Sequence, residues 1–258
     1  MNNLVTYEVK ERVGYITLNR PEKRNALSYE MVSEIKLAFM NAEADKDCKV
    51  IVIKGSGEAF CAGADLAYLQ QLQTNTFDEN LADSQHLMEL FQFIYHSHKV
   101  VISQVNGPAL AGGCGLAGVC DFSFATPEST FGYTEVKIGF VPAIVMVFLV
   151  RKVAEKNARE MLLTGDVFKA EKALQYGLIN QIVEANLLEE TVFNFAQKLC
   201  KQTSAQSLGL VKEMLAKVQS MDVNEALNYA AQTNAMARAT HDCKRGIAAF
   251  LNKEKLSW

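Results

Sequence analysis

The sequence lacks the features that mark membrane, metal-binding and nucleic-acid-binding proteins. Its most apolar stretch, residues 138–150, is shorter than the ~20 residues of a membrane span and contains a proline. The six cysteines form no C-x-x-C pair and have no histidine cluster beside them, which argues against a zinc site. The net charge of −3 provides no general attraction to nucleic acid or to a membrane surface. We therefore expect no metal, no membrane and no nucleic-acid partner.

The N-terminal residues also lack a basic region followed by an apolar run, so no secretory signal is evident. Most of the cysteines lie among apolar or small residues, as reduced and buried thiols do. The chain has 258 residues, of which 49% are hydrophobic and 21% are charged, which is typical of a globular protein with a large core. We expect a cytoplasmic protein made of one domain with an appendage, or of two small domains.

A pattern of two strands followed by a helix recurs along the first half of the chain. Residues 4–18 alternate apolar and polar side chains around a turn, which predicts a β-hairpin. Apolar residues at helical spacing then predict a helix over 31–42 that is capped by Ser28. Further predicted strands cover 50–53, 100–105, 122–125 and 179–183, and predicted helices cover much of 64–98 as well as 112–119, 157–163, 170–176 and 188–200. Recurrence without a strict sequence period favours a coiled stack of such units.

The composition shifts after residue 203, where three helical patterns follow one another. They cover 204–219, 222–237 and 242–253, with serine or aspartate at their starts. We predict a core over residues 1–200 and a separate helical region over 201–258.

Glycines are concentrated in residues 106–121, NGPALAGGCGLAGVCD, just after a predicted strand and at the start of a predicted helix. Each glycine inside a helix costs roughly 1 kcal/mol relative to alanine, so a group that approaches the backbone closely would explain them. The free N–H groups and positive dipole end of a helix start suit an anion, or an oxygen that becomes anionic during a reaction. Tight helix packing is the alternative. A second small-residue turn at residues 55–66, GSGEAFCAGADL, favours the binding site because each turn can supply one N–H group.

Several segments, in this order along the chain, resemble the crotonase or enoyl-CoA hydratase/isomerase superfamily. They are NRPEKRNAL (19–27), FCAGADL (60–66), NGPALAGGCGLAGVCD (106–121), FGYTEVKIGFVPA (131–143) and LTGDVFKAEKALQYGLIN (163–180). The resemblance implies an α/β fold, with a crotonase-like spiral core of ββα turns and a C-terminal helical oligomerisation region. It also implies self-association as a homotrimer or a hexamer.

The resemblance further implies an acyl-CoA thioester as substrate. In the family two backbone N–H groups hold the thioester oxygen, and by motif position these belong to Ala64 and Gly112. Glu135 occupies the position of a catalytic glutamate. Coenzyme A is part of the substrate, so no separate cofactor is expected.

Other residues at motif positions are expected to contact the acyl group or coenzyme A. Those within the core are Lys23, Arg24, Ala26, Ala62, Asp65, Leu66, Gly113, Gly115, Tyr133 and Lys137. Phe250 and Lys253 match positions from which a neighbouring subunit reaches the nucleotide. None of the four histidines has a catalytic spacing.

Gly115 departs from the family pattern, because hydratases of the family usually carry a second glutamate there. Glu135 alone could activate water and return the proton to the α-carbon, or it could shift a double bond as in the isomerases. The motifs around Gly115 and Glu135 are similar to those of bacterial methylglutaconyl-CoA hydratases of leucine degradation. Their substrates end in a carboxylate, for which Lys137, Tyr133 and Tyr68 are the candidate partners.

Three functions follow in order of preference. The first is an enoyl-CoA hydratase-type lyase acting on a branched or carboxylated enoyl-CoA, and the second is an enoyl-CoA isomerase that uses Glu135 as its sole acid and base. The third is a non-catalytic homologue that binds coenzyme A or RNA. The slightly negative charge and the lack of a lysine-rich helix argue against RNA binding.

Overall fold

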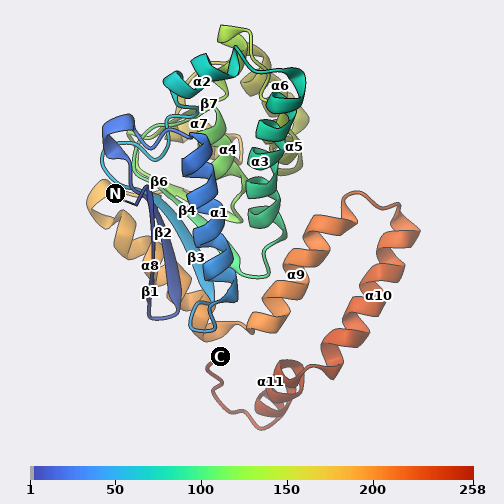
Figure 1. The fold of residues 1–258 in the computed structure, drawn as a ribbon. Helices are drawn as coiled ribbons and strands as arrows, with labels where there is room; N and C mark the ends of the chain where they lie inside the picture. The colour runs from blue at the N-terminus through green and yellow to red at the C-terminus, as the bar shows by residue number, and fades with distance from the viewer. Residues whose placement is uncertain (1–2) are drawn as a thin grey trace.

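The computed structural model describes residues 3–258 and has two β-sheets surrounded by helices (Figure 1). The larger sheet has the order β1-β2-β3-β4-β6-β9 and the smaller one the order β5-β7-β8. The strands are β1 (Val5–Lys10), β2 (Val13–Leu18), β3 (Val50–Gly55), β4 (Val100–Val105), β5 (Ala109–Leu110), β6 (Phe122–Ala125), β7 (Thr130–Gly132), β8 (Phe168–Lys169) and β9 (Gln181–Ile182). Only the β1–β2 hairpin is antiparallel in the larger sheet.

Helices cover both faces of the larger sheet. The α-helices are α1 (Tyr29–Ala44), α2 (Leu66–Leu72), α3 (Phe77–His96), α4 (Gly112–Val119), α5 (Ala143–Lys152), α6 (Glu155–Thr164), α7 (Ala170–Gln175), α8 (Leu188–Gln202), α9 (Ala205–Val218), α10 (Val223–Ala239) and α11 (His241–Leu251). Short 3₁₀ helices are η1 (Pro21–Lys23), η2 (Thr134–Ile138) and η3 (Ala185–Leu187).

Two hydrophobic clusters explain why the central strands are mostly apolar. The larger cluster lies between one face of the sheet and helices α1, α3 and α4, and the smaller one lies between the other face and α8. Parallel strands that are covered on both faces need apolar side chains on both. In β3 and β4, residues 50–53 and 100–105 are all buried.

Most predicted elements are confirmed. The hairpin, the helix over 112–119 and the strand over 122–125 have the predicted positions, and Ser28 accepts a hydrogen bond from the Met31 amide as the cap of α1. All six cysteines are free thiols, and five of them are buried. Among residues 3–258, no helix is both long enough and apolar enough to cross a bilayer.

Two elements near Glu135, the helices η2 and α5, were not predicted from the sequence. Residues 143–152, AIVMVFLVRK, have no polar face, so they lack the amphipathic period by which a helix is usually found. Only Val145 and Leu149 of this helix are buried.

Helices α9 to α11 project away from the core (Figure 1). Large apolar side chains on them remain exposed in the single chain, among them Leu227, Met236 and Phe250. Exposed apolar surface of this kind marks an interaction site. Trimer or hexamer formation through this region stays a prediction, as does the domain boundary after residue 200; the first two residues of the predicted core lie outside the described residues.

Candidate active site

Three backbone segments are hydrogen-bonded side by side at one end of the large sheet. The Ala62 amide donates to the Arg24 carbonyl at 3.0 Å, and the Leu27 amide donates to the Gly63 carbonyl at 2.7 Å. The Asp65 amide returns to the Leu27 carbonyl at 2.8 Å. These hydrogen bonds join the loop of residues 19–27 to the turn of residues 60–66.

The turn of the second motif also packs directly on the glycine-rich segment. The Leu110 amide donates to the Cys61 carbonyl at 3.0 Å. Gly63 has φ +92°, and a Cβ there would lie 2.9 Å from both the Ala111 Cβ and the Leu110 carbonyl oxygen. Only glycine allows this close backbone approach. Gly63 and Ala111 are in close contact. Ala64 directly follows Gly63, and Gly112 directly follows Ala111.

The amides of Ala64 and Gly112 are both free to bind a ligand. Gly112 is the first residue of α4, so its N–H has no intrahelical acceptor. Within residues 3–258, neither N–H donates a hydrogen bond to another protein group. Ala111 holds the start of α4 in place at φ 48°, a strained value for alanine, and its own amide donates to the Gly132 carbonyl at 2.7 Å. Such local strain is typical of functional sites.

A cavity of about 380 Å³ brings the three predicted catalytic residues together. Ala64, Gly112 and Glu135 all line it. Most of its remaining wall is apolar and comes from α1, α2, α3, α5 and the loop before α5, including Val32, Leu69, Leu72, Leu87, Phe140 and Ile144. An apolar cavity with a few convergent polar groups is the usual form of a small-molecule site.

Glu135 is buried in this cavity with one unpaired oxygen. It lies on η2 and is only 9% exposed, and its Oε2 atom has no hydrogen-bond partner among residues 3–258. Burial raises the pKa of Glu135, although its own backbone amide partly opposes the shift. A raised pKa brings a carboxyl group closer to neutral pH, where it can exchange protons during turnover.

Helix α5 fills the place of the second family glutamate. A Cβ on Gly115 would lie only 2.7 Å from the Cβ of Val145, and closer still to one of its methyl groups. Val145 itself lines the cavity, whereas Gly115 lies behind it. A longer side chain at 115 therefore has no room unless α5 changes.

We expect Gly115→Glu to destabilise the protein without improving catalysis. Overpacking of a core costs typically 1–3 kcal/mol, and the buried carboxylate adds to that cost. Thermal unfolding of this variant and of Gly115→Glu/Val145→Ala would check the explanation, because removing the Val145 methyl groups should recover part of the loss. An unchanged melting temperature in the single variant would contradict it.

The other residues predicted to contact substrate divide into two groups. Ala62 and Leu66 line the cavity. Ala26, Asp65, Gly113 and Gly115 do not, and they support the loops from behind. Burial raises the pKa of Asp65, but hydrogen bonds from the Tyr68 and Ala67 amides and the Arg20 guanidinium at 2.8 Å together leave this pKa lowered. Asp65 thus acts in this chain as the N-cap of α2.

Two of the three side chains expected to face a substrate carboxylate do not reach the cavity. Tyr133 is 1% exposed and packed inside the core, and Lys137 lies on the surface paired with Asp166 at 3.1 Å. Neither lines the cavity, because the chain passes from β7 into η2 with only Thr134, Glu135 and Ile138 turned toward it. The third candidate, Tyr68, does line it.

The residues predicted to bind the coenzyme lie outside the cavity. Lys23 and Arg24 are exposed on and just after η1. Phe250 is 82% exposed on α11, which Figure 1 shows at the opposite end of the molecule from α2, and Lys253 follows the same helix. Contact between these two residues and a neighbouring subunit's ligand stays a prediction.

The sequence analysis did not find the polar groups that α3 contributes. Asp83 lines the cavity and accepts a hydrogen bond from the Tyr68 hydroxyl. His86 also lines it, stacked on the Tyr29 ring at 4.1 Å and hydrogen-bonded to Ser33 and Lys36. Asp83, His86 and Leu87 are spaced as i, i+3 and i+4, and this spacing places them on one face of a helix.

Comparison with known proteins agrees with this geometry. The family model "Enoyl-CoA hydratase/isomerase" matches residues 8–258. The chain belongs to this family. A Thermus thermophilus protein described as a candidate enoyl-CoA hydratase is 43% identical over 95% of this chain and 96% of its own length. The crotonyl-CoA hydratase of Syntrophomonas wolfei is 33% identical over 98% of this chain and 97% of its own.

Solved structures of the family have the same fold. Human enoyl-CoA hydratase domain-containing protein 3 superposes with a TM-score of 0.91 at 31% identity, covering 99% of this chain and 100% of that one. An enoyl-CoA hydratase from Shewanella pealeana gives a TM-score of 0.93 at 27% identity, covering 99% and 96%. The predicted crotonase-like α/β fold with a helical C-terminal region is confirmed, and the chain is an enzyme of the enoyl-CoA hydratase/isomerase family.

Proposed function

We propose that this enzyme adds water to an α,β-unsaturated acyl-CoA, with Glu135 as its only acid and base. The observation that carries the proposal is the position of the buried Glu135, which lines the same cavity as Ala64 and Gly112 with their free amides. All three groups of the reaction are present, so a non-catalytic homologue has less support.

In the proposed reaction Glu135 removes a proton from water as the water oxygen bonds to the β-carbon. The electrons of the double bond move through the α-carbon to the thioester oxygen, which becomes an enolate. The amides of Ala64 and Gly112 stabilise this negative charge. The enolate then collapses as the α-carbon takes the proton from Glu135, so the hydroxyl group and the hydrogen of water have been added to the same face of the double bond.

An isomerase is the second candidate because Val145 occupies the space beside Gly115. Moving a double bond requires one group that takes a proton and returns it elsewhere, and a single carboxylate suffices. Crotonyl-CoA and a 3-enoyl-CoA distinguish the two reactions through the absorbance of the conjugated thioester. Hydration consumes this absorbance from crotonyl-CoA, whereas activity that only produces it from the 3-enoyl-CoA would replace the hydratase proposal with the isomerase.

For the acyl group, we propose an uncharged chain, straight or branched. The part of the cavity wall formed by described residues contains Asp83 and Glu135 but no lysine or arginine. A substrate carboxylate would meet negative charge there without a fixed cation. The predicted carboxylated substrate therefore takes second place, and the branched one is retained.

We expect Asp83→Asn to relax discrimination against a carboxylated substrate. Two like charges about 8 Å apart repel by about 2 kcal/mol at an effective dielectric constant of 20, so removing one should raise kcat/KM for 3-methylglutaconyl-CoA about tenfold or more. Asparagine still accepts the Tyr68 hydrogen bond, so kcat/KM for crotonyl-CoA should change less than about twofold. Asp78→Asn, at an exposed position on the same helix, is the matched control. Equal changes for both substrates would contradict the assignment.

A further inference from the structure

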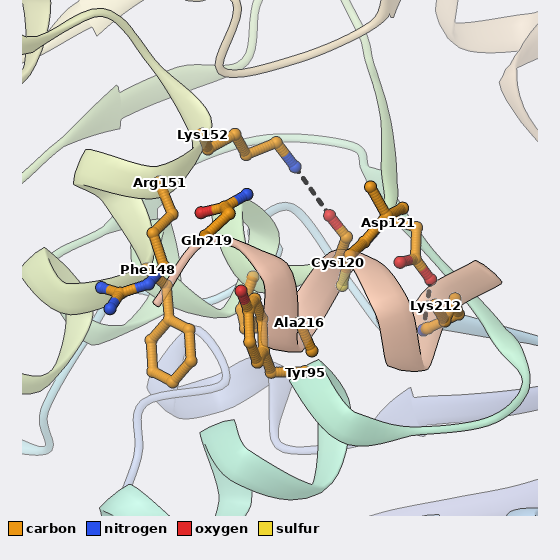
Figure 2. A pocket seen from close by; sticks show the side chains of 12 residues that line it. Tyr95, Cys120, Asp121, Phe148, Arg151, Lys152, Lys212, Ala216 and Gln219 are labelled. Carbon is orange, nitrogen blue, oxygen red and sulfur yellow. Dashed lines mark hydrogen bonds and ion pairs between the residues drawn. The ribbon is translucent and has the colours of Figure 1, made fainter. Parts of the chain in front are cut away.

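A second cavity, of about 190 Å³, lies at the far end of the helix that begins with Gly112 (Figure 2). Cys120, the residue after α4, lines it, together with residues from α5 and α9. None of its lining residues lines the active-site cavity. It is therefore a separate site, and the hydration proposal does not use it.

The only carboxylate of this second cavity is already neutralised. Asp121 Oδ2 accepts hydrogen bonds from Lys212 Nζ at 2.5 Å and from the Val101 amide at 2.7 Å. Lys212 is 7% exposed and also donates to the Lys99 carbonyl at 2.8 Å. This ion pair leaves two further cations in the wall of the cavity without a balancing charge.

These two cations come from the last turn of α5. Lys152 Nζ donates to the Cys120 carbonyl at 2.6 Å, and Arg151 Nη1 donates to the Val147 carbonyl at 2.6 Å. Neither side chain forms an ion pair with a carboxylate among residues 3–258. A lysine ammonium has three donors and an arginine guanidinium has five, so most of their donors are unused. Burial lowers the pKa of Lys152, as expected for a cation without a carboxylate partner.

Gln219 and Phe148 line the cavity together with these two cations, and Figure 2 draws all four side chains around it. The Gln219 side chain has no hydrogen-bond partner in the described part of the chain. The cavity thus offers N–H donors from three side chains, whereas its one carboxylate is occupied. This is the chemistry of an anion site.

Other residues of the cavity wall are apolar. The rings of Tyr95 and Phe148 lie 5.1 Å apart between centroids, and Leu215 and Ala216 of α9 complete this apolar part. The cavity has room for a small molecule. A ligand that matches both the cationic and the apolar part is small, carries one negative charge and has a short apolar tail.

We propose that this cavity binds a small aliphatic monocarboxylate. Its carboxylate lies against Lys152, Arg151 and Gln219, and its alkyl chain lies against Phe148 and Tyr95. Inorganic phosphate shares the negative charge but has no apolar part, so it matches only the cationic part of the cavity wall.

The test is a calorimetric titration of the full-length protein with sodium butyrate at constant ionic strength, with phosphate in a parallel series. We expect saturable binding of butyrate in the millimolar range, weakened at least tenfold by Arg151→Met and by Gln219→Leu. Both positions are exposed, so both variants should fold, and their melting temperatures verify this. Lys198→Met, at an exposed lysine outside the cavity, should bind as the wild type does. The Glu135→Gln variant should bind butyrate as the wild type does. This result would show that butyrate does not occupy the active site.

Three results would overturn the proposal. They are no saturable binding by the wild-type protein, binding that survives unchanged in both cavity variants, and binding of phosphate without binding of butyrate. The first two would remove the site, and the third would remove the carboxylate as its ligand.

Discussion

Replacement of Glu135 by glutamine is expected to lower kcat by about 10²- to 10⁴-fold, the usual contribution of a positioned acid or base. Glutamine has nearly the same shape, so KM should change little. In the wild-type enzyme the rate should fall at acid pH as Glu135 becomes protonated, with an inflection above its ordinary pKa of 4.5 because burial raises this pKa. Steady-state kinetics between pH 5 and 9 would check both statements.

The same substitution should stabilise the protein at alkaline pH. The raised pKa means that the folded state binds more protons than the unfolded state between pH 4.5 and the pKa of the folded form. The free energy of unfolding contributed by this group therefore decreases as pH rises through that interval, and the folded protein then carries a buried charge. Glu135→Gln removes this cost, so its stability advantage should be present at pH 8 and absent below pH 4.5. An inactive variant with no such difference would contradict the buried-carboxylate explanation.

Replacement of Gly112 by proline is expected to lower kcat by about 10²- to 10³-fold, because it deletes one of the two N–H groups that hold the enolate oxygen. Proline is tolerated at the first position of a helix, so α4 should still form. Gly112→Ala is the matched control, since it keeps the N–H and its Cβ would meet only the end of the Leu27 side chain at 3.1 Å.

The difference between proline and alanine at position 112 isolates the amide. The Cβ of alanine is expected to crowd the thioester and raise KM, but proline should lose far more in kcat. Circular dichroism and thermal unfolding would establish that both variants fold. Equal values of kcat for the two variants would show that the amide of Gly112 does not stabilise the transition state.

The central strands and the three residues proposed for catalysis could be predicted from the sequence. Continuous apolar runs predicted β3 and β4 because both of their faces are covered, and the glycine cluster predicted that a group approaches the start of α4. The resemblance to the crotonase superfamily then selected Ala64, Gly112 and Glu135, and all three line one cavity.

The rest of the site depended on packing that no local pattern records. The proximity of Val145 to Gly115 arises from the crossing of α4 and α5, and α5 has no polar face to reveal it. Tyr133 and Lys137 are both within two residues of Glu135, yet the turn into η2 buries one and exposes the other. The pairing of Tyr68 with Asp83 joins two helices whose relative position only the structure gives.

In the proposed mechanism, two backbone amides hold a thioester oxygen while Glu135 alone moves the proton. Its most direct test uses butyryl-CoA, which has no double bond to hydrate, in deuterium oxide, with exchange of the α-hydrogen followed by proton NMR. The account predicts exchange with the wild-type enzyme, at least 100-fold slower exchange with Glu135→Gln or Gly112→Pro, and near-normal exchange with Asp78→Asn. Undiminished exchange in the Glu135→Gln variant would contradict it.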